Sequence, residues 1–183
     1  ITLLDGITST VRKVPHSSIR KMFNVASTMD NVINFGIGEP DFDTPAGIIE
    51  AAKKAMDEGF THYTANAGLI ELREAIAAKL KADNDIDVSP STDIIVTSGG
   101  MGALALAVLT LAEEGDEVLL PDPSWCNYTS HVILAGAKPV FVQLSEENGF
   151  MLTAADIEKR ITDRTKLIII NSPANPTGAV ISA

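Results

Sequence analysis

The sequence predicts an α/β fold in which a mostly parallel β-sheet is flanked by helices. From residue 93 onward, short β-branched or apolar runs alternate with helical patterns. The connecting segments are short, and several predicted helices end at a glycine. One run, Leu167-Ile168-Ile169-Ile170, is apolar on both faces, which is typical of a strand covered by helices on both sides.

The N-terminal elements are predicted to be helical. A polar, weakly patterned arm contains one helix, over Ser17–Met29. A second helix is predicted to have Thr44 as its N-cap and Pro45 as its first residue, a position that proline tolerates well. This helix runs to about Glu58, and Gly59 closes it in the left-handed conformation.

The later elements follow the change from helical to strand periodicity along the chain. Thr153, with Asp156 three residues on, resembles a capping box at a helix start. In chain order we predict a helix over Leu69–Ala82, a strand over Asp93–Thr97, a helix over Met101–Glu113, a strand over Glu117–Leu120, a helix over Trp125–Ala135, a strand over Pro139–Leu144, a helix over Thr153–Ile161 and a strand over Lys166–Asn171.

The composition argues against several classes of protein. With 45% hydrophobic residues the chain is not expected to be disordered, and a net charge of -10 without a basic stripe disfavours a nucleic-acid binder. Cys126 is the only cysteine, so neither an internal disulfide nor a multi-cysteine zinc site can form, and we expect no metal. We find no signal-peptide pattern and no stretch of about 20 apolar residues, so we expect a cytoplasmic protein with no membrane span.

Three segments follow predicted strands, where open α/β sheets bind their ligands. The first is Thr97-Ser98-Gly99-Gly100-Met101-Gly102, which joins a strand to an apolar helix. Glycines allow the backbone to approach a ligand closely, and the free N–H groups of a helix N-terminus bind anions such as phosphate. The alternative is a glycine-rich turn that binds nothing, because the segment has neither Walker A nor Rossmann spacing.

The second segment is Pro121-Asp122-Pro123-Ser124-Trp125. Trp125, the only tryptophan, offers a flat apolar surface for a heteroaromatic ring at the ligand-binding edge of the sheet. The alternative is that Trp125 simply packs on the core at a helix start, which is the commoner fate of a single tryptophan and the one this segment favours when taken alone.

The third segment is Asn171-Ser172-Pro173-Ala174-Asn175-Pro176-Thr177-Gly178. Its prolines and glycine predict a rigid loop in which the Asn175 amide can donate to a ligand oxygen. The alternative is a structural turn in which the asparagine side chain bonds its own backbone. We also predict a cis peptide bond at Asn175–Pro176 and, as a second candidate, at Asp122–Pro123.

Six motifs taken together resemble class I aminotransferases of the aspartate and aromatic type, which depend on pyridoxal phosphate (PLP) and have fold type I. They are Asn34-Phe-Gly-Ile-Gly-Glu-Pro-Asp-Phe, His62-Tyr-Thr-Ala-Asn-Ala-Gly-Leu, Thr97-Ser-Gly-Gly, Gly115-Asp-Glu-Val, Pro123-Ser-Trp and Asn171-Ser-Pro-Ala-Asn-Pro-Thr-Gly. Each motif is weak alone, whereas their order and spacing are specific. The resemblance covers essentially the whole chain and corresponds to the N-terminal half of a family member.

The resemblance implies a domain organisation and a role for each site residue. Residues 1–40 would form the N-terminal arm and a small-domain segment, and residues 41–183 an incomplete large, PLP-binding domain. The implied site residues are Gly99, Gly100 and Met101 for the PLP phosphate, Trp125 stacked on the ring, Asn175 donating to the phenolic oxygen, Tyr63 reaching the partner's phosphate across a homodimer, and Gly38, Trp125 and Asn175 for the substrate.

The implied activity is transfer of an amino group from an L-amino acid, aspartate or aromatic, to a 2-oxo acid. No lysine here occupies the family's Schiff-base motif; that catalytic lysine is expected after Ala183, so the chain alone should be inactive. The sequence departs from the common pattern at Ile70, where proline is frequent, and at Gly102, where a larger polar residue is frequent. The alternatives are a carbon–sulfur lyase, an aminocyclopropane-carboxylate synthase-like enzyme, or a degenerate non-catalytic module.

Overall fold

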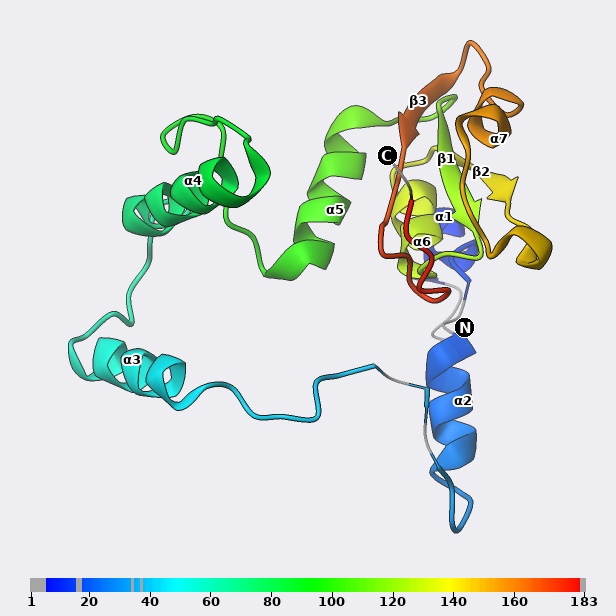
Figure 1. The fold of residues 1–183 in the computed structure, drawn as a ribbon. Helices are drawn as coiled ribbons and strands as arrows, with labels where there is room; N and C mark the ends of the chain where they lie inside the picture. Colours follow the sequence, from blue (N-terminus) through cyan, green and yellow to red (C-terminus); the bar gives the residue numbers. More distant parts are fainter. Residues whose placement is uncertain (1–5, 16–17, 34, 37, 182–183) are drawn as a thin grey trace. The chain divides into compact units, whose positions relative to one another are not determined.

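The computed structural model describes residues 6–15, 18–33, 35–36 and 38–181. The chain forms two compact units, one of residues 1–29 with 101–183 and the other of residues 30–100. The elements are α1 (Ser9–Arg12), α2 (Ser18–Ala26), α3 (Ala46–Asp57), α4 (Ile70–Asn84), α5 (Gly99–Leu111), β1 (Glu117–Asp122), α6 (Asn127–Leu134), β2 (Lys138–Gln143), η2 (Glu146–Asn148), α7 (Ala154–Glu158) and β3 (Thr165–Ile168) (Figure 1).

The first unit is built on a parallel sheet of three strands in the order β2-β1-β3. In Figure 1 the three strands lie side by side, with α6 and α7 next to them. Parallel pairing follows from the helical connections that return the chain to the same edge of the sheet after each strand. The predicted parallel sheet flanked by helices is therefore confirmed.

The core of this unit lies where α5 and α6 pack on β1. Because successive side chains of a strand point to opposite faces, Val118 and Leu120 face this cluster, and Leu119, on the other face, is also fully buried. The buried members of the cluster are Val108, Ala112, Val118, Leu120, Tyr128, Val132 and Ala137. The central strand thus has both faces covered, and it fixes the place where the loops after β1 and β3 begin.

One strand prediction is wrong, and another is correct in position but not in length or burial. Residues 93–97 form no strand among the described residues: the Val96 N–H donates to Ala67 O at 3.0 Å, but a single bond makes no ladder. The strand predicted over Lys166–Asn171 is shorter, and Ile168 and Ile170 are 40% and 55% exposed. Leu167 and Ile169 pack against the buried cluster on one face, whereas Ile168 and Ile170 lie on the other face, which the described residues leave partly uncovered although the composition suggested burial on both.

The helix predictions are correct in position, but one cap is wrong. The N-cap of α3 is Pro45 rather than Thr44, and Pro45 O accepts the Ile48 N–H at 2.9 Å. Gly59 has the expected left-handed conformation, with φ of 87°. At α7, Thr153 Oγ1 accepts the Asp156 N–H at 3.2 Å, as the capping pattern predicted. The start of the predicted arm helix, Ser17, lies outside the described residues, and α1 was not predicted.

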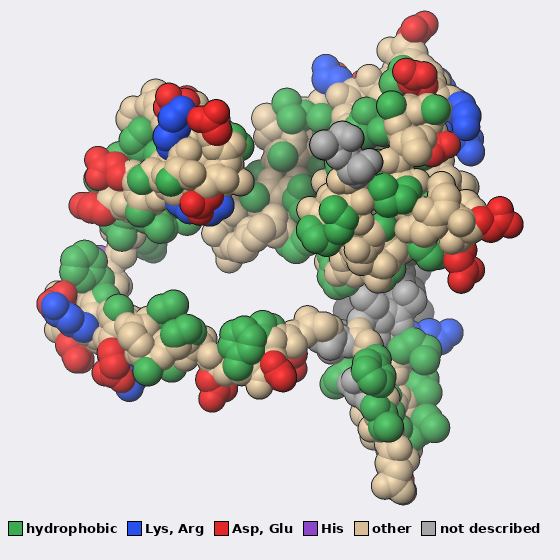
Figure 2. All heavy atoms as spheres, in the orientation of Figure 1, with side chains coloured by type: hydrophobic (Ala, Val, Ile, Leu, Met, Phe, Trp, Pro, Cys, Tyr) green, Lys and Arg blue, Asp and Glu red, His purple; other side chains and the backbone are tan. Residues whose placement is uncertain are grey.

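The second unit contains α3, α4 and their connecting segments. Arg73 of α4 is buried and donates to three carbonyl oxygens: Gly68 O at 3.2 Å, Pro90 O at 2.8 Å and Ser91 O at 3.3 Å. These bonds connect the segment before α4 and the segment after it to one side chain on the helix. None of the described residues of α3 is buried, and its hydrophobic residues Ile48 and Met56 are 61% and 59% exposed. Figure 2 shows hydrophobic side chains on the surface of this segment.

A buried carboxylate holds the amino end of the parallel strands. Glu117, at the start of β1, accepts from Thr162 Oγ1 at 2.7 Å, Lys138 Nζ at 3.0 Å and Arg164 Nη2 at 2.9 Å. The hydrogen bond from Thr162, then the hydrogen bond from Lys138, hold the pKa of Glu117 below its ordinary value of 4.5, although burial opposes them. These contacts connect β1 to β2 and to the turn before β3.

We expect acid to release this contact. Because the pKa of Glu117 is lower folded than unfolded, the stabilisation is complete above about pH 4.5 and is lost as the pH falls further. Glu117→Gln should therefore lower the melting temperature at pH 7, and the difference from wild type should shrink below pH 4.5. Thermal unfolding measured from pH 7 to pH 3 checks this, with the exposed Glu158→Gln as control. A difference that stays constant with pH would contradict it.

Candidate functional site

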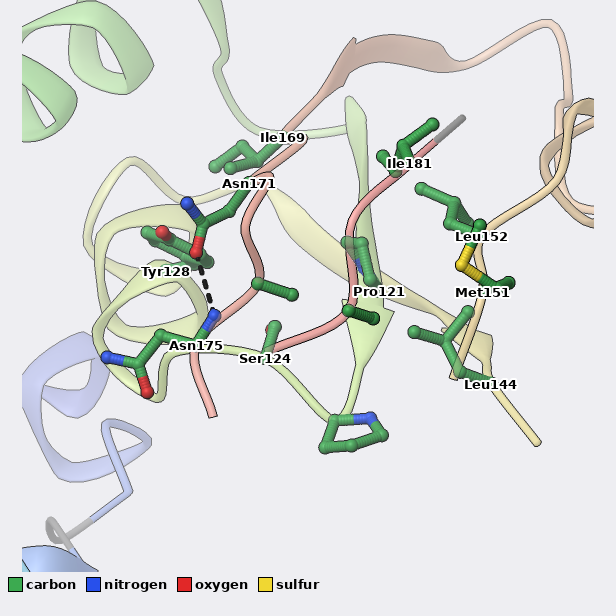
Figure 3. A pocket seen from close by; sticks show the side chains of 13 residues that line it. Pro121, Ser124, Tyr128, Leu144, Met151, Leu152, Ile169, Asn171, Asn175 and Ile181 are labelled. Carbon is green, nitrogen blue, oxygen red and sulfur yellow. Dashed lines mark hydrogen bonds between the residues drawn. The ribbon is translucent and has the colours of Figure 1, made fainter. Parts of the chain in front are cut away.

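The loops that follow β1 and β3 line one pocket at the carboxyl end of the sheet. β1 and β3 are adjacent parallel strands, so the loops after them meet at the same edge. This confirms that the second and third sequence segments come together. The lining residues are Pro121, Pro123, Ser124, Tyr128, Leu144, Met151, Leu152, Ile169, Asn171, Ala174, Asn175, Ala179 and Ile181 (Figure 3).

The pocket has a polar end and an apolar end. Figure 3 shows Asn171, Asn175 and Tyr128 at one end, and Leu144, Met151 and Leu152 at the other. The cavity volume of the pocket is about 20 Å³, which is enough for one water molecule. A planar ring of PLP size therefore does not fit inside the pocket, and the groups at its polar end are those that can face a larger ligand.

Asn175 presents a free carboxamide from a fixed backbone. Its N–H donates to Asn171 Oδ1 at 3.0 Å, drawn as the dashed line in Figure 3. Its own side chain is exposed and has no hydrogen-bond partner among the described residues. The structural turn that the sequence left as an alternative does exist, but Asn171 makes it, which leaves the Asn175 amide available to a ligand.

The loop from 171 to 181 is held by bonds within itself. The Ala174 N–H donates to Ala179 O at 2.9 Å, the Gly178 N–H to Ala174 O at 2.7 Å, and the Ile181 N–H to Ser172 Oγ at 3.0 Å. The predicted cis bonds at Asn175–Pro176 and Asp122–Pro123 are confirmed, and Ser172–Pro173 is also cis, which was not predicted. The third segment is thus the rigid loop that its prolines indicated.

Trp125 does not line this pocket. Its ring is half-buried and packs against the cluster formed by α5, α6 and β1. This contact matches the packing alternative of the sequence analysis, and the half-exposed ring also leaves surface for a ligand. Tyr128, three residues on, lines the pocket instead and was missed, although both lie in the segment predicted as one helix.

The Gly99–Gly100 turn forms the N-terminus of α5. Gly99, with φ of 78°, turns its N–H back to Thr97 O at 2.8 Å, so this donor is already used. The N–H groups of Gly100 and Met101 have no acceptor among the described residues. A Cβ added at Gly99 or Gly100 would meet nothing within 4 Å. The turn therefore offers two unpaired backbone donors at a helix N-terminus, and phosphate binding there stays a prediction.

The remaining predicted site residues lie in the second unit. Tyr63 is fully exposed, at 107%. Gly38 has open space around its α-carbon. Of the predicted site residues, only Asn175 lines the pocket. We still predict that the same site includes Gly38, Tyr63, Gly99 and Gly100.

The described residues contain neither a candidate metal site nor a membrane-spanning helix. No group of three or more His, Cys, Asp or Glu side chains there could hold a metal ion. No helix of the described residues has the length and apolar character needed to cross a bilayer.

Comparison with known proteins agrees with this geometry. Over 177 residues the chain is 46% identical to aromatic-amino-acid aminotransferase 2 of Thermococcus litoralis, covering 97% of this chain and 46% of that protein. It is 51% identical over 165 residues to the aspartate aminotransferase of Pyrococcus abyssi, covering 90% and 42%. The solved aspartate aminotransferase of Thermus thermophilus with maleate superposes with a TM-score of 0.90 at 37% identity, covering 97% and 47%.

The chain belongs to the aminotransferase class I and II family, whose model matches residues 30–183. The resemblance stated from six motifs is thereby confirmed, as is the type I fold. The chain spans a little under half the length of the curated relatives that it matches.

Proposed function

We propose that this chain is part of a PLP-dependent amino-acid aminotransferase that transfers an amino group from an L-amino acid to a 2-oxo acid. Aspartate or an aromatic amino acid is the proposed donor, because two relatives at 51% and 46% identity carry those names. The observation that carries the proposal is Asn175: its backbone is fixed, its carboxamide is unpaired among the described residues, and it lies at the ligand-binding edge of the sheet.

The residues present fit the cofactor. The free N–H groups of Gly100 and Met101 at the N-terminus of α5 would hold its phosphate, since a dianion is stabilised by a helix dipole. Trp125 would lie against its ring, and the Asn175 amide would donate to its phenolic oxygen and favour the ionised form of that oxygen. When bound, PLP supplies the electron sink for chemistry at the substrate Cα, while the protein orients the groups.

The other predicted residues complete the proposal. The Gly38 backbone would bind the substrate carboxylate, with Trp125 and Asn175 beside the substrate. Tyr63 would reach the phosphate bound by the partner subunit of a homodimer, which accounts for its full exposure in one chain. The cofactor-binding lysine would come from outside these 183 residues, and we propose a cytoplasmic location.

The test is an amino-transfer assay with a full-length protein that carries this chain. Purified protein with PLP is incubated with aspartate, phenylalanine or alanine and 2-oxoglutarate, and glutamate formation is measured. We expect glutamate with aspartate or phenylalanine, and none when 2-oxoglutarate is left out. A parallel incubation with cystathionine tests the alternative, because a carbon–sulfur lyase would break its Cβ–S bond and, with water, release pyruvate, ammonia and a thiol without glutamate. Failure to take up PLP would overturn the proposal.

A further inference from the structure

We propose that Asn171 is a positioning residue that fixes the direction of the Asn175 carboxamide, and that cofactor binding depends on it. The inference rests on the proposed function, because it assigns Asn175 to the cofactor. Asn171 itself need not touch the ligand. It acts through the 3.0 Å hydrogen bond from the Asn175 N–H to Asn171 Oδ1.

Asn171 is anchored to the sheet. Two residues earlier, the Ile169 N–H donates to Leu119 O at 3.1 Å, which extends the β3–β1 pairing beyond Ile168. Ile169 also packs against the buried cluster. The Asn171 side chain is half-buried and lines the pocket together with Asn175. It therefore connects the rigid sheet directly to the ligand-facing turn.

The peptide between Ala174 and Asn175 is held at both of its polar groups. Its C=O, on Ala174, accepts the Gly178 N–H at 2.7 Å, and its N–H, on Asn175, donates to Asn171 Oδ1 at 3.0 Å. The Asn171 oxygen is therefore one of two anchors of the peptide from which the Asn175 side chain starts, and it is the anchor that comes from the sheet side of the loop.

The side chains of Asn171 and Asn175 therefore have different roles. Asn171 uses its oxygen to satisfy a backbone donor, and Asn175 keeps its side chain free of partners among the described residues. Loss of the Asn171 oxygen leaves the Asn175 N–H unpaired, so that the bond from the Gly178 N–H alone holds this peptide and it can tilt more freely. The Asn175 carboxamide would then donate less well to the ligand oxygen, although it is still present.

The experiment compares variants of the full-length protein by two measurements other than activity. One is the dissociation constant of PLP, measured by titrating the cofactor-free protein. The other is the pH midpoint of the absorbance change of the bound cofactor. Asn171→Leu removes the acceptor at similar volume, and Asn171→Ala is the second variant if the leucine variant does not fold. Ser172→Ala is the matched control, because it removes another side-chain-to-backbone bond of the same loop.

We expect Asn171→Leu to weaken PLP binding about threefold to tenfold and to raise the absorbance midpoint by roughly half to one pH unit, the scale of a weakened hydrogen bond to a charged group. The midpoint rises because a weaker hydrogen bond from Asn175 stabilises the ionised phenolic oxygen of the cofactor less. Ser172→Ala should change neither quantity by more than about twofold or 0.2 unit.

A double-mutant cycle separates positioning from general damage. If Asn171 acts through Asn175, then Asn171→Leu adds little to an Asn175→Leu protein. Fully additive effects, or an unchanged midpoint in both Asn171 variants while Asn175→Leu shifts it, would overturn the inference alone. If the wild-type protein binds no PLP, or Asn175→Leu changes nothing, it is the proposed function that fails.

Discussion

Asn175→Leu in a full-length protein lowers kcat/KM for amino transfer by about 10- to 100-fold, the loss expected when one hydrogen bond to a charged group is removed. The side chain has no hydrogen-bond partner among the described residues, so its replacement breaks no hydrogen bond within the fold. The effect should therefore fall on the ligand and not on stability. The two measurements are steady-state kinetics with aspartate and the melting temperature of the cofactor-free protein.

The matched control is Asn148→Leu, the same change at an exposed asparagine that does not line the pocket. It should leave kcat/KM within about twofold of wild type, as most surface substitutions do. A large fall in the melting temperature of Asn175→Leu, with kinetics that scale with the folded fraction, would show that the residue is only structural.

Gly68→Ala destabilises the second unit by about 2–5 kcal/mol. The position has φ of 96°, where a side chain costs about 1–2 kcal/mol. The added Cβ would also lie 2.7 Å from Val96 Cβ and Cγ2, and such overpacking costs about 1–3 kcal/mol. Gly68 O is an acceptor of buried Arg73, so the glycine cannot move without disturbing that contact.

Gly47→Ala is the control in the same unit. Gly47 lies within α3, and a Cβ there would meet nothing within 4 Å. Alanine should therefore be neutral or stabilise the helix by about 0.5–1 kcal/mol. Urea unfolding of both variants of a full-length protein tests these two predictions through the unfolding midpoints. Equal midpoints for Gly68→Ala and Gly47→Ala would contradict the expected clash.

The sequence was sufficient for the features that depend on local pattern. Helix positions follow from periodicity and glycine caps, and Gly59 has the conformation that its position after a helix predicted. The rigid Asn171–Gly178 loop also follows from its composition, because two prolines and a glycine restrict the backbone wherever they occur.

The pocket itself could be predicted only in part. The sequence placed the loops after β1 and β3 at one edge, and they meet there. It did not assign Asn171, because nothing in the chain order shows which of the two asparagines bonds the backbone. It also did not place Leu144, Met151 and Leu152 in the lining, since these residues follow β2 and precede α7 with no signal beyond their apolar character.

By itself, then, the sequence determined the fold class, the family and the rigid loops, because these depend on residue type, order and spacing. Tertiary structure alone decided which strand is buried on both faces and which amide stays free. Composition favoured residues 167–170 for double burial, but Ile168 and Ile170 are exposed, and β1 is the strand whose two faces are both buried. The burial of β1 and the unpaired carboxamide of Asn175 both depend on residues that are distant in the chain. Which residues contact a side chain is decided only when the chain has folded.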